Sequence, residues 1–131
     1  MQKMIDEYNL NVTLKGQAEN VQEKLKEYDL FVMSSLYEGF SISVLEAMAL
    51  GIPLLLSDIA SFREQCESTA VYYDLKNNND FITKLLGLIN NKQQREFLGN
   101  AAKKRLVENF TLDKHMHQLK KIYISAFSGT E

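Results

Sequence analysis

Two short apolar runs, LFVM at residues 30–33 and PLLL at residues 53–56, lie on either side of a segment that contains strong helix formers. The first run is followed by Ser34 and Ser35. Each of the two runs is too short for a stable helix, so each favours a buried strand. The segment between them has room for one helix. The pattern therefore predicts a βαβ unit, in which the strands are parallel and the crossover is right-handed.

The segment between the two runs carries the signals of a helix with defined ends. Residues 42–50 are strong helix formers, and Ser41 or Ser43 can act as the N-cap. Gly51 supplies a C-terminal stop, and the proline two residues later cannot continue a helix. The sequence EGFS at residues 38–41 predicts a turn before the helix, because glycine lets the backbone bend sharply or approach a ligand closely.

The rest of the chain also alternates between short strands and helices. Strands are expected at residues 11–15, ending at Gly16, and at residues 70–73; helices are expected at residues 1–9, 21–28, 59–66, 81–89 and 93–109, and from residue 112 onward. Asp80 and Thr111 are the expected N-caps of two of these helices, and the tail after Ser128 is expected to fray. This alternation predicts an α/β fold with a mostly parallel sheet flanked by helices.

Apolar stripes at helical spacing mark the faces that we expect to be buried. They consist of Phe81, Ile82, Leu85, Leu86, Leu88 and Ile89 in one helix, Phe97, Leu98, Ala101, Ala102 and Leu106 in the next, and Leu112, Met116, Leu119, Ile122, Tyr123, Ala126 and Phe127 in the last.

Composition narrows the function classes. With 131 residues and 45% hydrophobic content, the chain is expected to form one globular domain. A formal net charge of −2 gives no electrostatic case for nucleic acid binding, and no apolar run is long enough for a membrane span. Cys66 is the single cysteine, which excludes an internal disulfide and favours a reducing compartment. His115 and His117 do not share a helix face, so no metal site is expected.

The start of the helix at residue 42 is the candidate binding site. A helix N-terminus that follows a strand offers unpaired N–H groups and a partial positive charge, and it commonly binds phosphate. No lysine or arginine lies between residues 27 and 62. Any phosphate here would be held by backbone N–H groups, with cationic side chains coming from elsewhere.

Two carboxylates flank this expected anion site. Glu38 lies just before the helix, and Glu46 lies roughly one turn, about 5 Å, inside it. Carboxylates accept two hydrogen bonds well from a vicinal diol, so the pair suits a nucleotide sugar. Two structural alternatives stay open: Ser43 and Glu46 also fit a capping box, and Glu38 also fits a solvated loop carboxylate. From spacing alone, these alternatives rank first.

The sequence EGFSISVLEAMALGIPLLLSD closely resembles the E-G-F-x-x-x-x-L-E-A-M-A-x-G-x-P-V-V-x-S-D signature of family 4 glycosyltransferases. These are retaining, nucleotide-sugar-dependent hexosyltransferases with the GT-B fold. The resemblance runs from about residue 9 to 127 and covers only the C-terminal, donor-binding half, which is Rossmann-like. It implies that residues 1–131 form a single, partial nucleotide-sugar-binding domain, and it reverses the ranking for both glutamates.

The resemblance also implies roles for individual residues. Glu38 would be the catalytic carboxylate that binds the donor sugar hydroxyls and supports charge at the anomeric carbon, and Glu46 would hold the ribose diol. The backbone of Gly39, Phe40 and Ser41 would approach the sugar and diphosphate. Gln17 and Ala18 are candidate base contacts, with a plain αβ connection as the alternative reading.

By the same resemblance, the chain binds a nucleotide sugar, needs no metal or other cofactor, and acts in polysaccharide or glycoconjugate biosynthesis. It would be cytoplasmic, with membrane-peripheral attachment of a complete enzyme as an alternative. The function alternatives are a non-catalytic interaction domain that retains the fold, and a nucleotide-binding module of another GT-B family, such as an epimerase.

Two parts of the family's pattern have no counterpart in this sequence. The family's donor domain opens with two further strands and an Arg/Lys pair that clamps the diphosphate, and nothing before Val12 matches them. The acceptor-binding domain has no counterpart either, so we expect no sugar transfer by this chain alone. In GT-B enzymes the final helix reaches back towards that domain, so the resemblance gives an alternative for the apolar stripe of the last helix: part of it would meet the missing domain. A strand order of 3-2-1-4-5-6 would leave the strand at residues 30–33 with an open edge. We expect either pairing with residues 12–15, self-association, or a separate acceptor-binding polypeptide.

Overall fold

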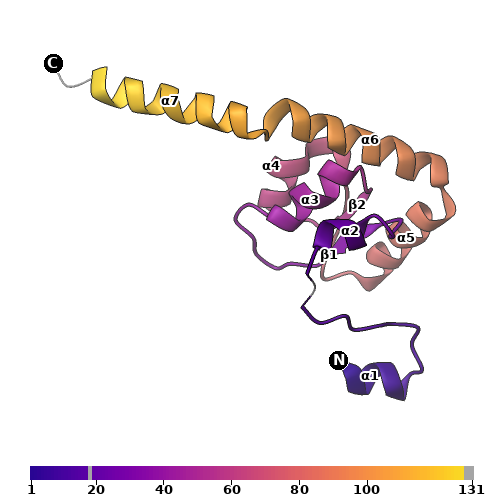
Figure 1. Ribbon diagram of the computed structural model, residues 1–131. Coiled ribbons are helices and arrows are strands. Elements are labelled where there is room, and N and C mark those ends of the chain that lie inside the picture. The colour runs from indigo at the N-terminus through magenta and orange to yellow at the C-terminus, as the bar shows by residue number, and fades with distance from the viewer. Residues whose placement is uncertain (18, 129–131) are drawn as a thin grey trace.

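The computed structural model describes residues 1–17 and 19–128, and its centre is a three-stranded sheet in the order β1-β2-β3 (Figure 1). The strands are β1 (Phe31–Met33), β2 (Leu54–Ser57) and β3 (Val71–Tyr73). Both neighbouring pairs are parallel, with Val32 opposite Leu55. The predicted α/β fold and parallel βαβ unit are confirmed.

The helix α3 (Ile42–Leu50) joins β1 to β2, with the predicted ends. The Ser41 hydroxyl accepts a hydrogen bond from the N–H of Val44 at 3.4 Å, so Ser41 rather than Ser43 is the N-cap. Gly51 ends the helix at a φ of +72°, a left-handed conformation that favours glycine. The start of α3 is therefore fixed at the end of the sheet where β1 finishes.

Six further helices and one 3-10 turn complete the described part of the chain. They are α1 (Gln2–Glu7), α2 (Val21–Leu25), α4 (Ala60–Cys66), η1 (Glu67–Thr69), α5 (Asn78–Asn90), α6 (Lys92–Asn109) and α7 (Leu112–Ser128). In Figure 1, α1 lies apart from the sheet and α7 projects away from the body of the molecule.

The core covers both faces of the central strand. Leu54 and Leu56 lie in one buried cluster with residues of α3, α4 and α6, whereas Leu55 lies in a second cluster with Leu88 of α5 and Leu98 of α6. All four residues of β2 are buried, which explains why its three leucines follow one another instead of alternating with polar residues. This double-sided burial holds the start of α3 in place.

The expected strand at residues 11–15 is not formed, which corrects the sequence interpretation. Residues 11–16 have no regular secondary structure, and the Val12 side chain is 50% exposed. The Val12 N–H donates to the Leu10 carbonyl at 2.8 Å, a tight local turn that an extended strand cannot contain. No described strand pairs with this segment, so its alternating apolar side chains are not part of a sheet.

Two helix boundaries differ from expectation by three residues. The helix expected to reach Tyr28 ends at Leu25, because the N–H of Tyr28 turns back to the Leu25 carbonyl at 3.1 Å, an i to i−3 bond. The N-cap of α5 is Asn77 rather than Asp80, since the Asn77 side chain accepts from the Asp80 N–H at 3.1 Å. Asp80 instead lies in the first turn of the helix.

The apolar stripes are only partly buried. Leu88, Leu98 and Ala102 are buried, and Phe81, Leu85, Ala101 and Leu106 are half-buried, as the stripes of α5 and α6 predicted. Ile82, Leu86 and Ile89 are about half exposed, and Phe97 is 72% exposed. On α7, Leu119 is half-buried and the other apolar residues of its stripe are exposed. The core expectation for the last helix is therefore wrong within the described structure.

Candidate functional site

The loop from β1 to α3 carries Glu38, whose side chain is half-buried. The Ser35 hydroxyl donates to a Glu38 carboxylate oxygen at 2.9 Å. The buried Ser57 hydroxyl, at the end of β2, donates in turn to the Ser35 carbonyl at 2.6 Å. Glu38 is thus tied to the end of the central strand, which is more order than an ordinary solvated loop carboxylate would have.

Gln65 of α4 holds the other end of the same loop. Its side-chain oxygen accepts from the Ser41 N–H at 3.1 Å, and its amide nitrogen donates to the Ser41 carbonyl at 2.9 Å. Sequence reasoning did not identify this residue. The available signal was a polar residue on the buried face of a short helix, between Phe62 and Cys66.

The hydrogen bonds of Ser41 decide which amides at the start of α3 are open. The N–H groups of Val44 and Leu45 donate to the Ser41 hydroxyl and carbonyl, and the Ser41 N–H donates to Gln65. Within the described structure, the N–H groups of Ile42 and Ser43 donate to no protein acceptor, and both residues are exposed. These two amides provide the anion-binding potential of the helix start.

Glu46 lies on α3, five residues after the N-cap, so it does not occupy the position that a capping box requires. Its half-buried side chain lines an open depression of about 380 Å³. The other lining residues are the four residues 20–23, from the N-cap and first turn of α2. Glu46 is therefore available to a ligand that enters between α2 and α3.

The two candidate base contacts do not join this depression. Gln17 is exposed and does not line it, and Ala18 lies outside the described residues. Asn20, at the N-cap of α2, is the residue of this connection that lies beside Glu46.

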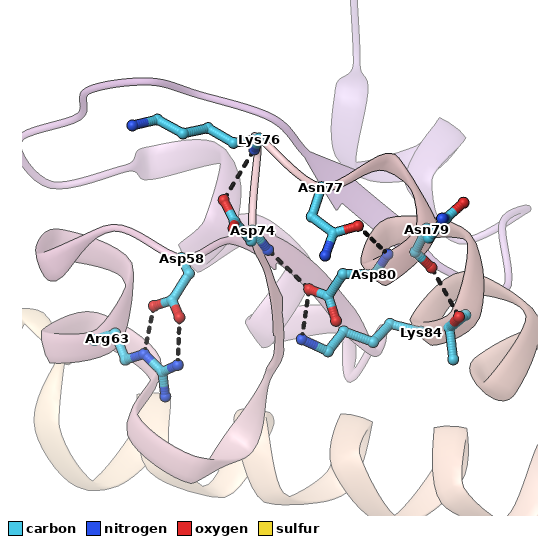
Figure 2. Close-up of polar contacts among 9 residues, drawn as sticks. Asp58, Arg63, Asp74, Lys76, Asn77, Asn79, Asp80 and Lys84 are labelled. Carbon is cyan, nitrogen blue, oxygen red and sulfur yellow. Dashed lines mark hydrogen bonds and ion pairs between the residues drawn. The ribbon is translucent and has the colours of Figure 1, made fainter.

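The carboxyl ends of β2 and β3 are rich in charge, and two of the basic side chains there, Arg63 and Lys84, are paired with carboxylates (Figure 2). Arg63 donates twice to Asp58, at 2.6 and 2.7 Å, and these hydrogen bonds hold the pKa of Asp58 below its ordinary value. Lys84 donates to Asp80 at 2.7 Å and, together with the Asp74 N–H, lowers the pKa of Asp80. Arg63 and Lys84 are thus engaged by carboxylates and form no open clamp for a diphosphate.

Cys66 is a core residue. Burial raises the pKa of its thiol to about 12, so the thiol stays protonated at neutral pH and is unsuited to act as a nucleophile. Among the residues that the structure describes, no group of three or more histidine, cysteine or acidic side chains could hold a metal ion. Likewise, none of the described helices combines the length and apolarity that a membrane crossing needs.

Comparison with known sequences relates the chain to glycosyltransferases. Residues 1–105 match the family described as Glycosyl transferases group 1. A poly(ribitol-phosphate) alpha-N-acetylglucosaminyltransferase of Staphylococcus aureus is 32% identical over 117 residues, covering 85% of this chain and 24% of that protein. A trehalose synthase of Thermococcus litoralis is 29% identical over 121 residues, covering 90% of this chain and 29% of that protein. The chain thus spans less than a third of the length of these relatives.

Comparison with solved structures supports the same fold. A sucrose-phosphate synthase from Thermosynechococcus elongatus superimposes with a TM-score of 0.87 at 22% identity, covering 98% of this chain and 34% of that one. The described sheet and helices therefore have the arrangement found in part of that GT-B structure.

Proposed function

Because this chain belongs to the Glycosyl transferases group 1 family, we propose that it is the nucleotide-sugar-binding half of a retaining, family 4 type glycosyltransferase in polysaccharide or glycoconjugate biosynthesis. The observation that carries the proposal is the start of α3. Two open N–H groups at Ile42 and Ser43 lie between a carboxylate before the helix and another inside it. Backbone donors suit a diphosphate, and the flanking carboxylates suit the sugars at its two ends.

In this proposal the two glutamates act at opposite ends of the donor. Glu38 binds hydroxyls of the transferred sugar and supports positive charge at the anomeric carbon. Its hydrogen bond from Ser35 supports this role, because it holds the carboxylate in one orientation. Glu46 accepts hydrogen bonds from the ribose diol, and its place in the depression beside α2 supports that role.

The backbone around Gly39 and Phe40 approaches the sugar and diphosphate. Gly39 has open space where a side chain would begin, which supports a close approach of ligand to backbone. Ser41 acts through its position as N-cap, since its own N–H is already bonded to Gln65. The base lies near the connection that contains Gln17 and Ala18 and ends at Asn20.

We expect a nucleoside diphosphate or its sugar ester to bind weakly to the purified chain, in the millimolar range that corresponds to about −4 kcal/mol. The reason is that Arg63 and Lys84, two basic side chains at the carboxyl ends of β2 and β3, are already paired with carboxylates. Replacing Glu46 by glutamine should weaken this binding about tenfold, because the diol loses a charged acceptor. The six ligands UDP, GDP, ADP and their glucose esters are titrated into each protein. Calorimetry and amide chemical shifts then measure the affinity of the wild type and its decrease in the Glu46 variant.

Glu96→Gln is the matched control, since Glu96 is an exposed glutamate on α6 that lines none of the depression beside Glu46. Equal affinities for the Glu46 variant and the wild type would contradict the ribose assignment. No binding of any of the six compounds would contradict the donor-binding proposal and favour a non-catalytic interaction domain.

We further propose that the chain does not transfer sugar by itself and works with an acceptor-binding partner, either a separate domain or another copy of the chain. Transfer requires donor and acceptor to be held together, because proximity supplies much of the rate. Incubation with the same three glucose esters and a panel of sugar and alditol-phosphate acceptors should give slow donor hydrolysis at most. Robust transfer that Glu38→Gln abolishes would show instead that this chain is a minimal enzyme.

A further inference from the structure

Gln65 makes a two-point contact with a single residue of the loop before α3. The Ser41 N–H and carbonyl are both bonded to its carboxamide, at 3.1 and 2.9 Å, and the Gln65 side chain is buried with 1% of the residue exposed. Only one orientation of the amide places its donor against a carbonyl and its acceptor against an N–H. The contact therefore fixes the Ser41 backbone as a neighbouring β-strand would.

The helix that carries Gln65 is itself anchored. Arg105 of α6 donates to the backbone carbonyls of Gln65 and Glu64, each at 2.8 Å, and forms an ion pair with Glu67 at 2.8 Å. The Arg105 side chain is only 15% exposed, so its guanidinium is largely shielded from water, whereas the Glu67 side chain of the ion pair is 65% exposed. Carbonyls at the end of a helix lack intrahelical partners, and a guanidinium that satisfies two of them holds the end of α4 against α6.

A second contact connects the same loop to the same part of the fold. The rings of Phe40 and Phe110 meet edge to face, with centroids 5.3 Å apart, and the Arg105 guanidinium lies over the Phe110 ring at 5.6 Å from its centroid. Phe40 is 54% exposed, so this contact alone leaves the loop free to move. Gln65 supplies the buried constraint.

We propose that Gln65, which Arg105 holds in place, is the positioning residue of the donor site. It fixes the Ser41 backbone, and the Ser41 backbone in turn determines where Glu38 and the open amides of Ile42 and Ser43 lie. The inference rests on the proposed function for the binding of a nucleoside diphosphate. It adds that the diphosphate is bound by amides beyond Ser41, since Gln65 already occupies the Ser41 N–H.

The test compares Gln65→Leu with the wild type and with Leu85→Ala. Leucine keeps most of the volume but leaves the buried N–H of Ser41 without a partner, and it leaves the Ser41 carbonyl with the Leu45 N–H alone. Leu85 packs against the other core cluster, around Leu55, so its truncation lowers stability without touching the loop. Both variants are measured at a temperature at which circular dichroism shows them folded.

Two readouts are needed. Amide hydrogen exchange of the ligand-free proteins should show faster exchange at Ser41 and Val44 in Gln65→Leu, beyond any global change, and no such local change in Leu85→Ala. Titration with UDP and UDP-glucose should give affinities about tenfold weaker in Gln65→Leu, the effect of about one buried hydrogen bond, and unchanged in Leu85→Ala.

Gln65→Glu adds a pH-dependent readout. The ionised carboxylate still accepts from the Ser41 N–H but repels the Ser41 carbonyl, whereas the protonated carboxyl can donate to it. The exchange protection of Ser41 should therefore recover as the pH is lowered from 8 to 5 in this variant, and stay constant in the wild type.

The outcomes separate the two proposals. If the wild type binds UDP and Gln65→Leu binds it equally well, the positioning role is wrong and the donor-site proposal stands. If the wild type binds neither UDP, GDP, ADP nor any of their glucose esters, the donor-site proposal is wrong, and the positioning role that rests on it is wrong too. Unchanged exchange at Ser41 in Gln65→Leu would overturn the structural basis of the inference whatever the nucleotide result.

Discussion

Replacing Gly99 with alanine is expected to lower the melting temperature by more than about 10 °C, or to prevent folding at ambient temperature. Gly99 is buried in α6, and a Cβ at this position would lie 2.0 Å from the Gly51 carbonyl oxygen and 2.9 Å from its carbon. Both are backbone atoms, so no side chain can rotate away. Separating the two elements costs about 3 kcal/mol or more, out of a total stability of about 5–15 kcal/mol.

The carbonyl that blocks a side chain at Gly99 belongs to the residue that ends α3. Gly51 has a φ of +72°, and its N–H bonds to the Met48 carbonyl at 3.0 Å, so its backbone cannot tilt without breaking the end of the helix. The clash in Gly99→Ala should therefore displace the C-terminal end of α3, the helix that carries the candidate site at its N-terminal end.

Gly87→Ala is the matched control, because it makes the same change in the last turn of α5. Nothing lies within 4 Å of a Cβ there, so alanine should raise stability by about 0.5–1 kcal/mol through its better helix propensity. Thermal and urea unfolding followed by circular dichroism measure both variants. A Gly99 variant as stable as the wild type would contradict the close approach of α6 to the end of α3.

The centre of the fold was predictable because its signals are local. The strands and helix of the βαβ unit are each set by residues within a few positions of their ends: serines after the first run, a serine N-cap, Gly51 and Pro53. The choice between Ser41 and Ser43 as N-cap needed the structure. Because the N-cap is Ser41, the capping-box interpretation of Glu46, which requires Ser43 as the N-cap, is also excluded.

The N-terminal segment was mispredicted because a strand needs a neighbour. Residues 11–15 alternate as a strand does, but their pairing depends on what lies beside them in space, and no described strand does. The same limit applies to Gln65, whose partner Ser41 is 24 positions away. A buried amide on an apolar helix face indicates that it needs a hydrogen-bond partner, without saying which one.

Purified chain is expected to sediment faster as its concentration rises, because α7 presents an apolar stripe that is largely exposed. Five residues of this stripe, Leu112, Met116, Leu119, Tyr123 and Ala126, are spaced alternately four and three residues apart, which is the spacing of helices that pair side by side. Figure 1 shows that α7 projects from the body of the molecule. A projecting helix of this length is marginal in water unless its apolar side is covered, so association of two such helices is favoured.

Two neighbouring substitutions separate the stripe from general effects of charge. Met116→Lys places a charge in the stripe, whereas His117→Lys places the same residue on the polar side of α7. Sedimentation velocity from about 5 to 500 μM protein should show association of the wild type and of His117→Lys, and a monomer for Met116→Lys. A wild-type monomer throughout this range would contradict the expectation, since it would show that the exposed stripe is tolerated.

The edge of β1 offers a different route to association, and it can be tested in the same experiment. Within the described structure β1 pairs only with β2, and Val32 is 42% exposed, so the free edge could add a strand from another chain. Val32→Lys would block that route, as charged residues on natural edge strands do. If Val32→Lys is monomeric and Met116→Lys still associates, the strand edge rather than α7 drives association. We expect the reverse, because a three-residue strand buries less apolar surface than five side chains of a helix.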